Sequence, residues 1–167
     1  PELLVLSPDP HYTSAHHACR SAPASRVVLF HADRSSAFGA SSRWFRFIFW
    51  PTLVRMEINA VLMRAGIAPF LATSAEARLL VTLQGAAALH VSGGGFMTGP
   101  TRSRLWDTCL ILRLCQRLGN PYFLTGQTLG IFQRRADRWL ARGALRGALG
   151  ISLRDPGDSE RELAALG

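Results

Sequence analysis

The chain has 167 residues, and its 19 basic residues, all arginine, against 11 acidic ones give a formal net charge of +8. Hydrophobic residues make up 48% of the sequence, which excludes an intrinsically disordered chain. The length fits one domain with its own core, and the dispersed glycines and prolines exclude collagen-like and low-complexity structure.

Five short apolar runs are typical of buried strands. Most are followed by glycine, proline or small polar residues, which favour turns and so end strands. The expected strands are residues 2–7, 26–30, 87–92, 122–125 and 150–153.

Between these strands, apolar residues recur at helical spacing. The expected helices are residues 11–20, 43–63, 74–85, 104–118 and 134–149, and a last helix capped by Asp158 or Ser159. Pro51 predicts a break or a first turn within the second of these helices. Thr73 or Ser74 fits the N-cap of the third, and Gly119 fits the C-terminal end of the fourth.

Short strands that alternate with helices predict a parallel sheet. We therefore expect an α/β fold: a Rossmann-like parallel sheet with helices on both faces, formed by residues 1–167 as a single domain. The chain begins with Pro1 rather than methionine, which indicates a piece of a longer protein or a processed product.

The arginines are dispersed along the chain, which argues against a nucleic-acid site built on clustered cations. Their densest group is Arg134, Arg135, Arg138, Arg142 and Arg146. These fall largely on one helical face, so we expect a solvated face, with an anionic partner or a membrane surface as alternatives. Residues 1–10 lack the basic start of a signal peptide, which favours a cytoplasmic location.

The cysteines have no paired spacing and predict neither a disulfide framework nor a zinc site. Cys109 and Cys115 lie in an apolar helical run and are expected to be core thiols. No metal site is expected at the single cluster of histidines with a cysteine, which consists of His11, His16, His17 and Cys19.

Residues 43–50 interleave arginines with aromatic residues. We expect a core helix with arginines at its edge; the alternatives are docking at a membrane and contact with another domain. His90 lies in an apolar strand and is expected to be a hydrogen-bonded core residue, with a role in a cleft as the alternative.

Three of the expected strands end in polar or glycine-rich segments, and parallel α/β sheets bind ligands at these ends. The segments are Ser92-Gly93-Gly94-Gly95, Thr125-Gly126-Gln127 and Arg154-Asp155. The glycines would let backbone amides approach an anion, with a tight turn as the alternative. Arg154 can hold a carboxylate or phosphate in bidentate fashion, unless it pairs with Asp155 or Asp158. A P-loop is excluded because the chain has no lysine.

Three motifs follow one another along the chain: residues 90–98 with the triple glycine, residues 120–132 with the Gly-Gln pair, and residues 151–155 followed by Ser159. Together they resemble the polysaccharide pyruvyl transferase family. Ile131 stands where that family usually has proline, and residues 35–65 match it poorly.

The resemblance implies one half of a two-domain, glycosyltransferase-B-like transferase. Such an enzyme transfers pyruvate from phosphoenolpyruvate to a sugar of a cell-envelope polysaccharide as a ketal. Phosphoenolpyruvate is then the donor substrate, and no cofactor is expected. The implied substrate-binding residues are Ser92, Gly93, Gly94, Gly95, Gln127 and Arg154.

The resemblance also implies that the catalytic histidine belongs to a carboxyl-terminal domain. Residues 1–167 are then the amino-terminal half, with no catalytic residue and no activity alone. The implied acceptor is a sugar or a lipid-linked saccharide, which places the enzyme in the cytoplasm at the inner face of the membrane.

Two other functions stay open on the sequence. One is half of a nucleotide-sugar glycosyltransferase, which competition by a nucleoside diphosphate would reveal. The other is a non-catalytic basic module that binds a membrane or nucleic acid through residues 43–50.

Overall fold

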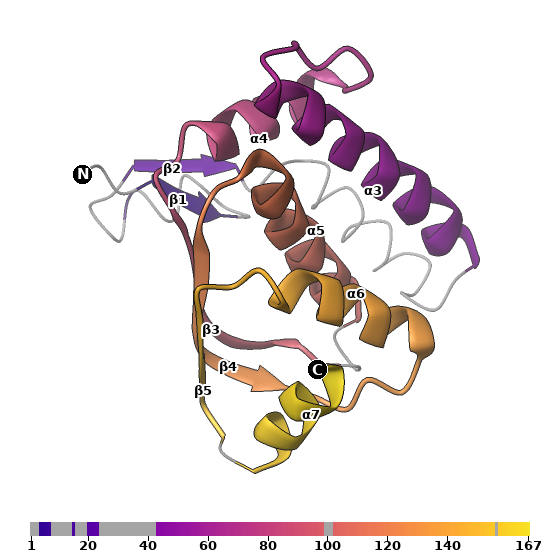
Figure 1. Cartoon of the computed structure of the whole chain (residues 1–167), viewed down its shortest axis with the longest axis vertical. Helices are drawn as coiled ribbons and strands as arrows, with labels where there is room; N and C mark the ends of the chain where they lie inside the picture. Colours follow the sequence, from indigo (N-terminus) through magenta and orange to yellow (C-terminus); the bar gives the residue numbers. More distant parts are fainter. Residues whose placement is uncertain (1–3, 8–14, 16–19, 24–42, 99–101, 156) are drawn as a thin grey trace.

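The computed structural model describes residues 4–7, 15, 20–23, 43–98, 102–155 and 157–167 (Figure 1). Its elements in chain order are β1 (Leu4–Ser7), β2 (Arg20–Pro23), α3 (Arg43–Arg64), α4 (Ser74–Gln84), β3 (Leu89–Met97), α5 (Arg102–Leu118), β4 (Tyr122–Leu129), α6 (Arg135–Leu145), β5 (Gly150–Leu153) and α7 (Asp158–Leu166).

Strands β3, β4 and β5 form a parallel sheet in that order, and β1 and β2 form a separate parallel pair. Helix α5 connects β3 to β4, and α6 connects β4 to β5. Crossovers of the same hand between neighbouring strands place both helices on one face of the sheet, as Figure 1 shows. The predicted α/β class with a Rossmann-like parallel sheet is confirmed.

The two faces of this sheet differ. Tyr122 and Leu124 point into the core that the helices cover. On the opposite face, His90, Ser92 and Phe123 are exposed. Among the described residues, the helical cover that the sequence predicts for both faces is therefore present on one of them.

Trp106 of α5 is fully buried in the core. Its ring centroid lies 4.5 Å from that of Phe49 and 5.4 Å from that of Trp50, so α5 holds the beginning of α3 in place. Burial of a large apolar side chain contributes about 1.5–3 kcal/mol, so this cluster is a main source of stability.

The two cysteines of α5 are core thiols, as predicted. Cys109 and Cys115 are buried and free. Burial raises the pKa of the Cys109 thiol far above its usual value and that of Cys115 to about 12. Both therefore stay protonated and unreactive at neutral pH.

Helix α3 runs unbroken through Pro51, where the sequence predicts a break or a first turn. Proline removes the hydrogen bond to the carbonyl four residues earlier, here that of Phe47. Both Phe47 and Pro51 are exposed, so water can satisfy this carbonyl and the helix continues.

Helix α4 begins with a capping box, which settles its N-cap as Thr73. The Thr73 hydroxyl accepts from the Glu76 N–H, and the Glu76 carboxylate accepts from the Thr73 N–H. Glu76 also pairs with Arg55 of α3, which ties the two helices together.

Helix α6 is shorter than predicted and ends at Leu145 rather than at residue 149. The Leu149 N–H donates to the Tyr122 carbonyl at 2.8 Å, so the chain has already joined the sheet there. A Cβ at Gly147 would lie 2.6 Å from Gln116 Nε2 and 2.7 Å from Tyr122 Oη, so glycine is needed in this connection.

The N-terminal prediction is corrected at one point. Arg20, the expected end of a helix, is the first residue of strand β2 and pairs with Leu4 of β1. Most of the predicted helix at residues 11–20, and the whole predicted strand at 26–30, lie outside the described residues.

None of the helices in the described ranges is both long enough and apolar enough to cross a membrane.

Candidate functional site

The structure brings the predicted site segments together at the carboxyl ends of the strands. Ser92 of β3 lies opposite Thr125 of β4, and Gly94 lies opposite Gln127. On the other side of β4, the Arg154 N–H donates to the Gln127 carbonyl at 2.8 Å. The glycine segment, Gln127 and Arg154 therefore follow one another across the same edge of the sheet.

The triple glycine lies within strand β3, whereas the sequence predicts a strand that ends at Ser92. A Cβ at Gly93 would lie 2.6 Å from the Gly126 carbonyl oxygen, and Gly126 itself has a φ of +60°. Glycines at both positions thus let β3 and β4 approach closely. In the sequence they look like turn formers; in the structure they extend both strands.

A bulge in β4 decides where Gln127 points. The four residues of β4 from Leu124 to Gln127 match three residues of β5, from Ile151 to Leu153. The extra residue changes the alternation of the strand, so Gln127 points into the interior and is fully buried.

The Gln127 side chain holds the two strands together at this bulge. Its Nε2 donates to the carbonyls of Val91 and Thr125, each at 3.2 Å. Its Oε1 is buried and has no hydrogen-bond partner among the described residues. The side chain therefore supports the edge from inside the sheet, and its backbone carbonyl anchors Arg154.

Arg154 is exposed directly after β5. The two carboxylates that could neutralise it have other contacts: Asp155 accepts from Thr128 Oγ1 at 3.3 Å, and Asp158 pairs with Arg161 at 3.4 Å. Within the described ranges, no ion pair includes Arg154. An anchored backbone and an exposed guanidinium suit the binding of an anion from solvent.

Ser159 has a role that sequence reasoning missed, because it looked like a helix cap. Gly157 is the N-cap of α7, and Ser159 is buried in the first turn. Its hydroxyl accepts from the Leu129 N–H at 3.0 Å and donates to the Leu129 carbonyl at 3.2 Å. This pair fixes α7 to the end of β4 and so bounds the loop that carries Arg154.

His90 lies on the exposed face of the sheet, which corrects the expectation of a core residue. Its Nε2 is 2.8 Å from Thr125 Oγ1, so the expected hydrogen bond is present. Its ring stacks on that of Phe123, with 4.6 Å between the centroids. Ser92, opposite Thr125, shares this face and adds a third polar side chain beside the glycines.

Asp107 in α5 is a second residue that sequence reasoning missed. Burial raises the pKa of its carboxyl to about 8, and its Oδ1 has no partner among the described residues. The sequence signal that could have revealed this buried carboxyl is an acid within an otherwise apolar helical stripe. Near neutral pH the carboxyl is largely protonated.

The beginnings of α5 and α6 are joined by a buried ion pair. Asp137 Oδ1 accepts from Arg102 Nε at 2.8 Å and from Trp106 Nε1 at 2.7 Å. The Arg102 guanidinium lies over the Trp106 ring, 4.6 Å from its centroid. Both helices begin at the carboxyl edge of the sheet, so this contact sets their spacing there.

Two aromatic residues at the start of α3, Phe49 and Trp50, have the expected core role, and the side chains of residues 43–46 lie outside the described part of the chain. Phe49 and Trp50 pack on Trp106, and Trp50 also contacts Trp139 of α6. Phe47, in contrast, is exposed.

In the described ranges, no group of three or more His, Cys, Asp or Glu side chains is placed to hold a metal ion. The histidine cluster considered in the sequence lies outside those ranges.

A family model described as polysaccharide pyruvyl transferase matches residues 1–167. No curated protein and no solved structure matches the chain.

Proposed function

Because this chain belongs to the polysaccharide pyruvyl transferase family, a family of transferases with polysaccharide acceptors, we propose that it supplies the donor-binding edge of a ketal-forming enzyme. The donor is phosphoenolpyruvate, and the acceptor is a sugar of a cell-envelope polysaccharide or its lipid-linked precursor. The prediction that the catalytic histidine belongs to a further, carboxyl-terminal domain is part of this proposal.

The reaction is balanced without an oxidant or reductant. Two acceptor hydroxyls form bonds to C2 of phosphoenolpyruvate, and the bond between C2 and the phosphate oxygen breaks. One hydroxyl proton is gained by the methylene carbon, which becomes a methyl group, and the other leaves with the phosphate. Donor and leaving group are both anionic, so guanidinium groups and backbone N–H groups stabilise them.

The observation that carries the proposal is the position of Arg154. It is exposed beside the glycine-rich ends of β3 and β4, and the Gln127 carbonyl fixes its backbone. Ligands of parallel α/β sheets bind at this edge, and a guanidinium fits either anionic group of phosphoenolpyruvate in bidentate fashion.

Isothermal titration of the chain with phosphoenolpyruvate tests the proposal. We expect binding that weakens by about 10- to 100-fold in Arg154→Ala, because a charge-assisted pair is lost. Arg161→Ala removes another exposed arginine, on α7, and should leave the affinity unchanged.

Equal weakening in both variants, or no binding of phosphoenolpyruvate to the wild-type chain, would overturn the donor-site proposal. Binding of a nucleoside diphosphate in its place would assign the edge to a nucleotide-sugar glycosyltransferase. Circular dichroism of each variant shows whether the fold is retained.

A further inference from the structure

Helix α6 presents a strip of arginines to solvent. Helix α6 contributes three arginines, and the strip extends beyond both of its ends, to Arg134 at the N-cap and Arg146 at the C-cap. All five members are exposed: Arg134, Arg135, Arg138, Arg142 and Arg146. The single acid of the helix, Asp137, is buried against Arg102 and does not neutralise them. Among the described residues, none of the five arginines forms an ion pair.

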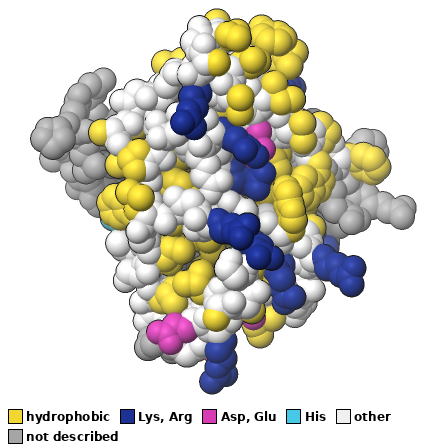
Figure 2. Space-filling view, viewed as in Figure 1, with side chains coloured by type: hydrophobic (Ala, Val, Ile, Leu, Met, Phe, Trp, Pro, Cys, Tyr) yellow, Lys and Arg dark blue, Asp and Glu magenta, His cyan; other side chains and the backbone are white. Residues whose placement is uncertain are grey.

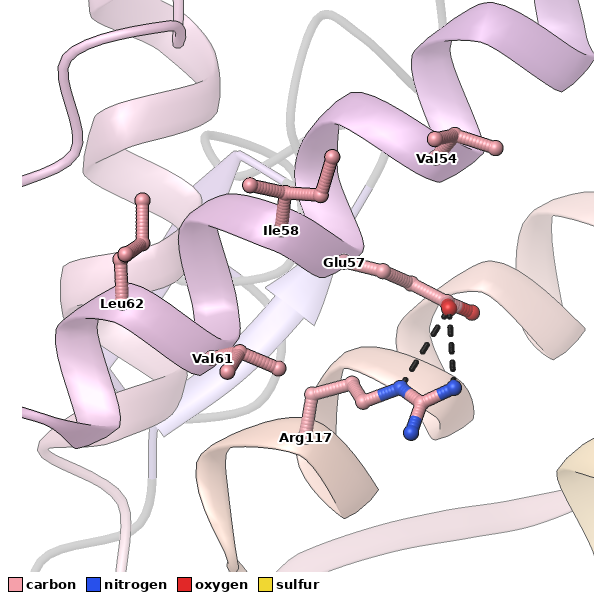
Figure 3. A pocket seen from close by; sticks show the side chains of 6 residues that line it. All are labelled: Val54, Glu57, Ile58, Val61, Leu62 and Arg117. Carbon is pink, nitrogen blue, oxygen red and sulfur yellow. Dashed lines mark hydrogen bonds and ion pairs between the residues drawn. The ribbon is translucent and has the colours of Figure 1, made fainter.

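Helix α3 presents an apolar strip. Its members follow helical spacing and are exposed: Phe47 (74%), Val54 (55%), Ile58 (45%) and Val61 (49%). Val54, Ile58 and Val61 line an open groove of about 310 Å³, with Leu62 and the Glu57–Arg117 pair at its sides (Figure 3).

The two strips belong to one surface, because α5 links them. Arg113 of α5 pairs with Glu57 of α3 and lies 4.8 Å from the ring centroid of Trp139 of α6. Trp139 is 53% exposed and contacts Trp50 of α3, so an aromatic ring lies between the arginines and the aliphatic residues. Figure 2 shows basic side chains crossing this face next to apolar ones.

Among the described residues, Glu57 is the acid between the two strips, and it is paired with more than one arginine. Glu57 pairs with both Arg113 and Arg117, so the region between the strips adds positive rather than negative charge. A partner of this surface must therefore offer anions to the arginine strip and apolar volume to the α3 groove.

We propose that this surface of α3 and α6 binds an anionic lipid bilayer. The arginines contact lipid phosphates, and Trp139, Phe47 and the aliphatic residues of α3 enter the headgroup region. Amphipathic surfaces with arginine on one side and tryptophan and aliphatic residues on the other bind membranes in this way. Nucleic acid would satisfy the arginines but would leave the aliphatic groove in water. This inference does not depend on the identity of the donor substrate.

Sedimentation of the chain with vesicles tests the proposal. Vesicles of phosphatidylcholine with roughly 30% phosphatidylglycerol, whose surface potential is negative, are compared with vesicles of phosphatidylcholine alone. We expect binding to the anionic vesicles that falls about fivefold for Arg138→Gln and about 25-fold for Arg138→Gln with Arg142→Gln. Arg161→Gln on α7 is the matched single control and should change binding less than twofold.

The apolar strip is tested separately. Val54→Ser with Ile58→Ser replaces exposed side chains, so the fold is retained while binding weakens at unchanged charge. Vesicles should shift the tryptophan emission of the wild-type chain to the blue, and Trp139→Phe should remove most of that shift.

Equal binding to neutral vesicles, equal losses in Arg161→Gln and Arg138→Gln, or an unchanged blue shift in Trp139→Phe would each overturn the proposal. Tighter binding of a single-stranded oligonucleotide, lost in the same arginine variants, would assign the surface to nucleic acid and also overturn it. Phosphoenolpyruvate titration of Arg138→Gln with Arg142→Gln should match the wild type, which separates this proposal from that of the donor site.

Discussion

At the scale of single residues, the most consequential group is a carboxyl that is largely protonated near neutral pH. Asp107 is buried without a partner for Oδ1 among the described residues, and burial raises the pKa of its carboxyl to about 8. In the unfolded chain an aspartate titrates near 3.9. The folded protein therefore retains a proton at pH values where the unfolded chain has released it.

This difference makes stability depend on pH. From about pH 4 to pH 8, unfolding releases the Asp107 proton, so the free energy of unfolding falls as the pH rises, by up to about 1.4 kcal/mol per pH unit from this group. Above pH 8 both states are ionised and the contribution levels off. Asp107→Asn cannot ionise, so we expect it to gain stability relative to the wild type between pH 5 and pH 8, measured by urea denaturation.

Asp158→Asn is the matched control, since Asp158 is exposed and its ion-pair partner among the described residues is the exposed Arg161. The free energy of unfolding of this variant should stay within about 0.5 kcal/mol of the wild-type value at every pH. If the free energy of unfolding of Asp107→Asn changed with pH in parallel with that of the wild type, the raised pKa would be wrong.

At the scale of elements, Ser159 shows how one side chain joins a helix to a strand. Its hydroxyl satisfies both the N–H and the carbonyl of Leu129, so α7 is fixed where β4 ends. Ser159→Ala leaves both groups buried without this partner, and we expect a loss of about 1–3 kcal/mol in the free energy of unfolding. Hydrogen exchange at the Leu129 amide should become faster.

Ser152→Ala is the control for this change, because Ser152 is exposed on β5 and a surface substitution costs less than about 0.5 kcal/mol. Equal effects of the two substitutions in urea denaturation would mean that the Leu129 contacts contribute nothing.

Elements with a strong local signal could be predicted from the sequence, and those set by long-range contacts could not. The predicted strand 150–153 matches β5, and Gly119 follows α5 with a φ of +84°, as a helix-ending glycine does. Strands β3 and β4 extend past their predicted ends because Gly93 and Gly126 meet across the sheet. No local pattern reveals such a meeting, since each glycine alone favours a turn.

The same distinction applies to the candidate site. The topological rule that ligands bind at the carboxyl ends of parallel strands was enough to predict that Gly94, Gln127 and Arg154 lie together. The direction of the Gln127 side chain follows from a bulge between β4 and β5, which depends on two segments far apart in the chain. The exposure of His90 likewise depends on which face the helices cover, and the apolar pattern of its strand could not decide that.

At the scale of the whole molecule, the described arginines include buried ones that form ion pairs and exposed ones that do not. Some arginines are buried in ion pairs that join elements, as Arg102 joins α5 to α6 and Arg113 joins α5 to α3. The arginines of α6 remain in solvent and give one face its positive charge. Within the described part of the chain, the α6 arginines thus give this face a local excess of positive charge.

The buried pair of Arg102 and Asp137 links the carboxyl edge of the sheet to the aromatic core, because Asp137 also accepts from Trp106. Asp137→Ala leaves a buried guanidinium and a buried indole N–H without their acceptor, so we expect a loss of about 3–5 kcal/mol in urea denaturation. Arg102→Met with Asp137→Ala removes both charges. The double variant should therefore lose less than the sum of the single variants, by about 1–3 kcal/mol. Additive losses within about 0.5 kcal/mol would show that the two charges do not interact, and that Asp137 is retained only as the acceptor for Trp106.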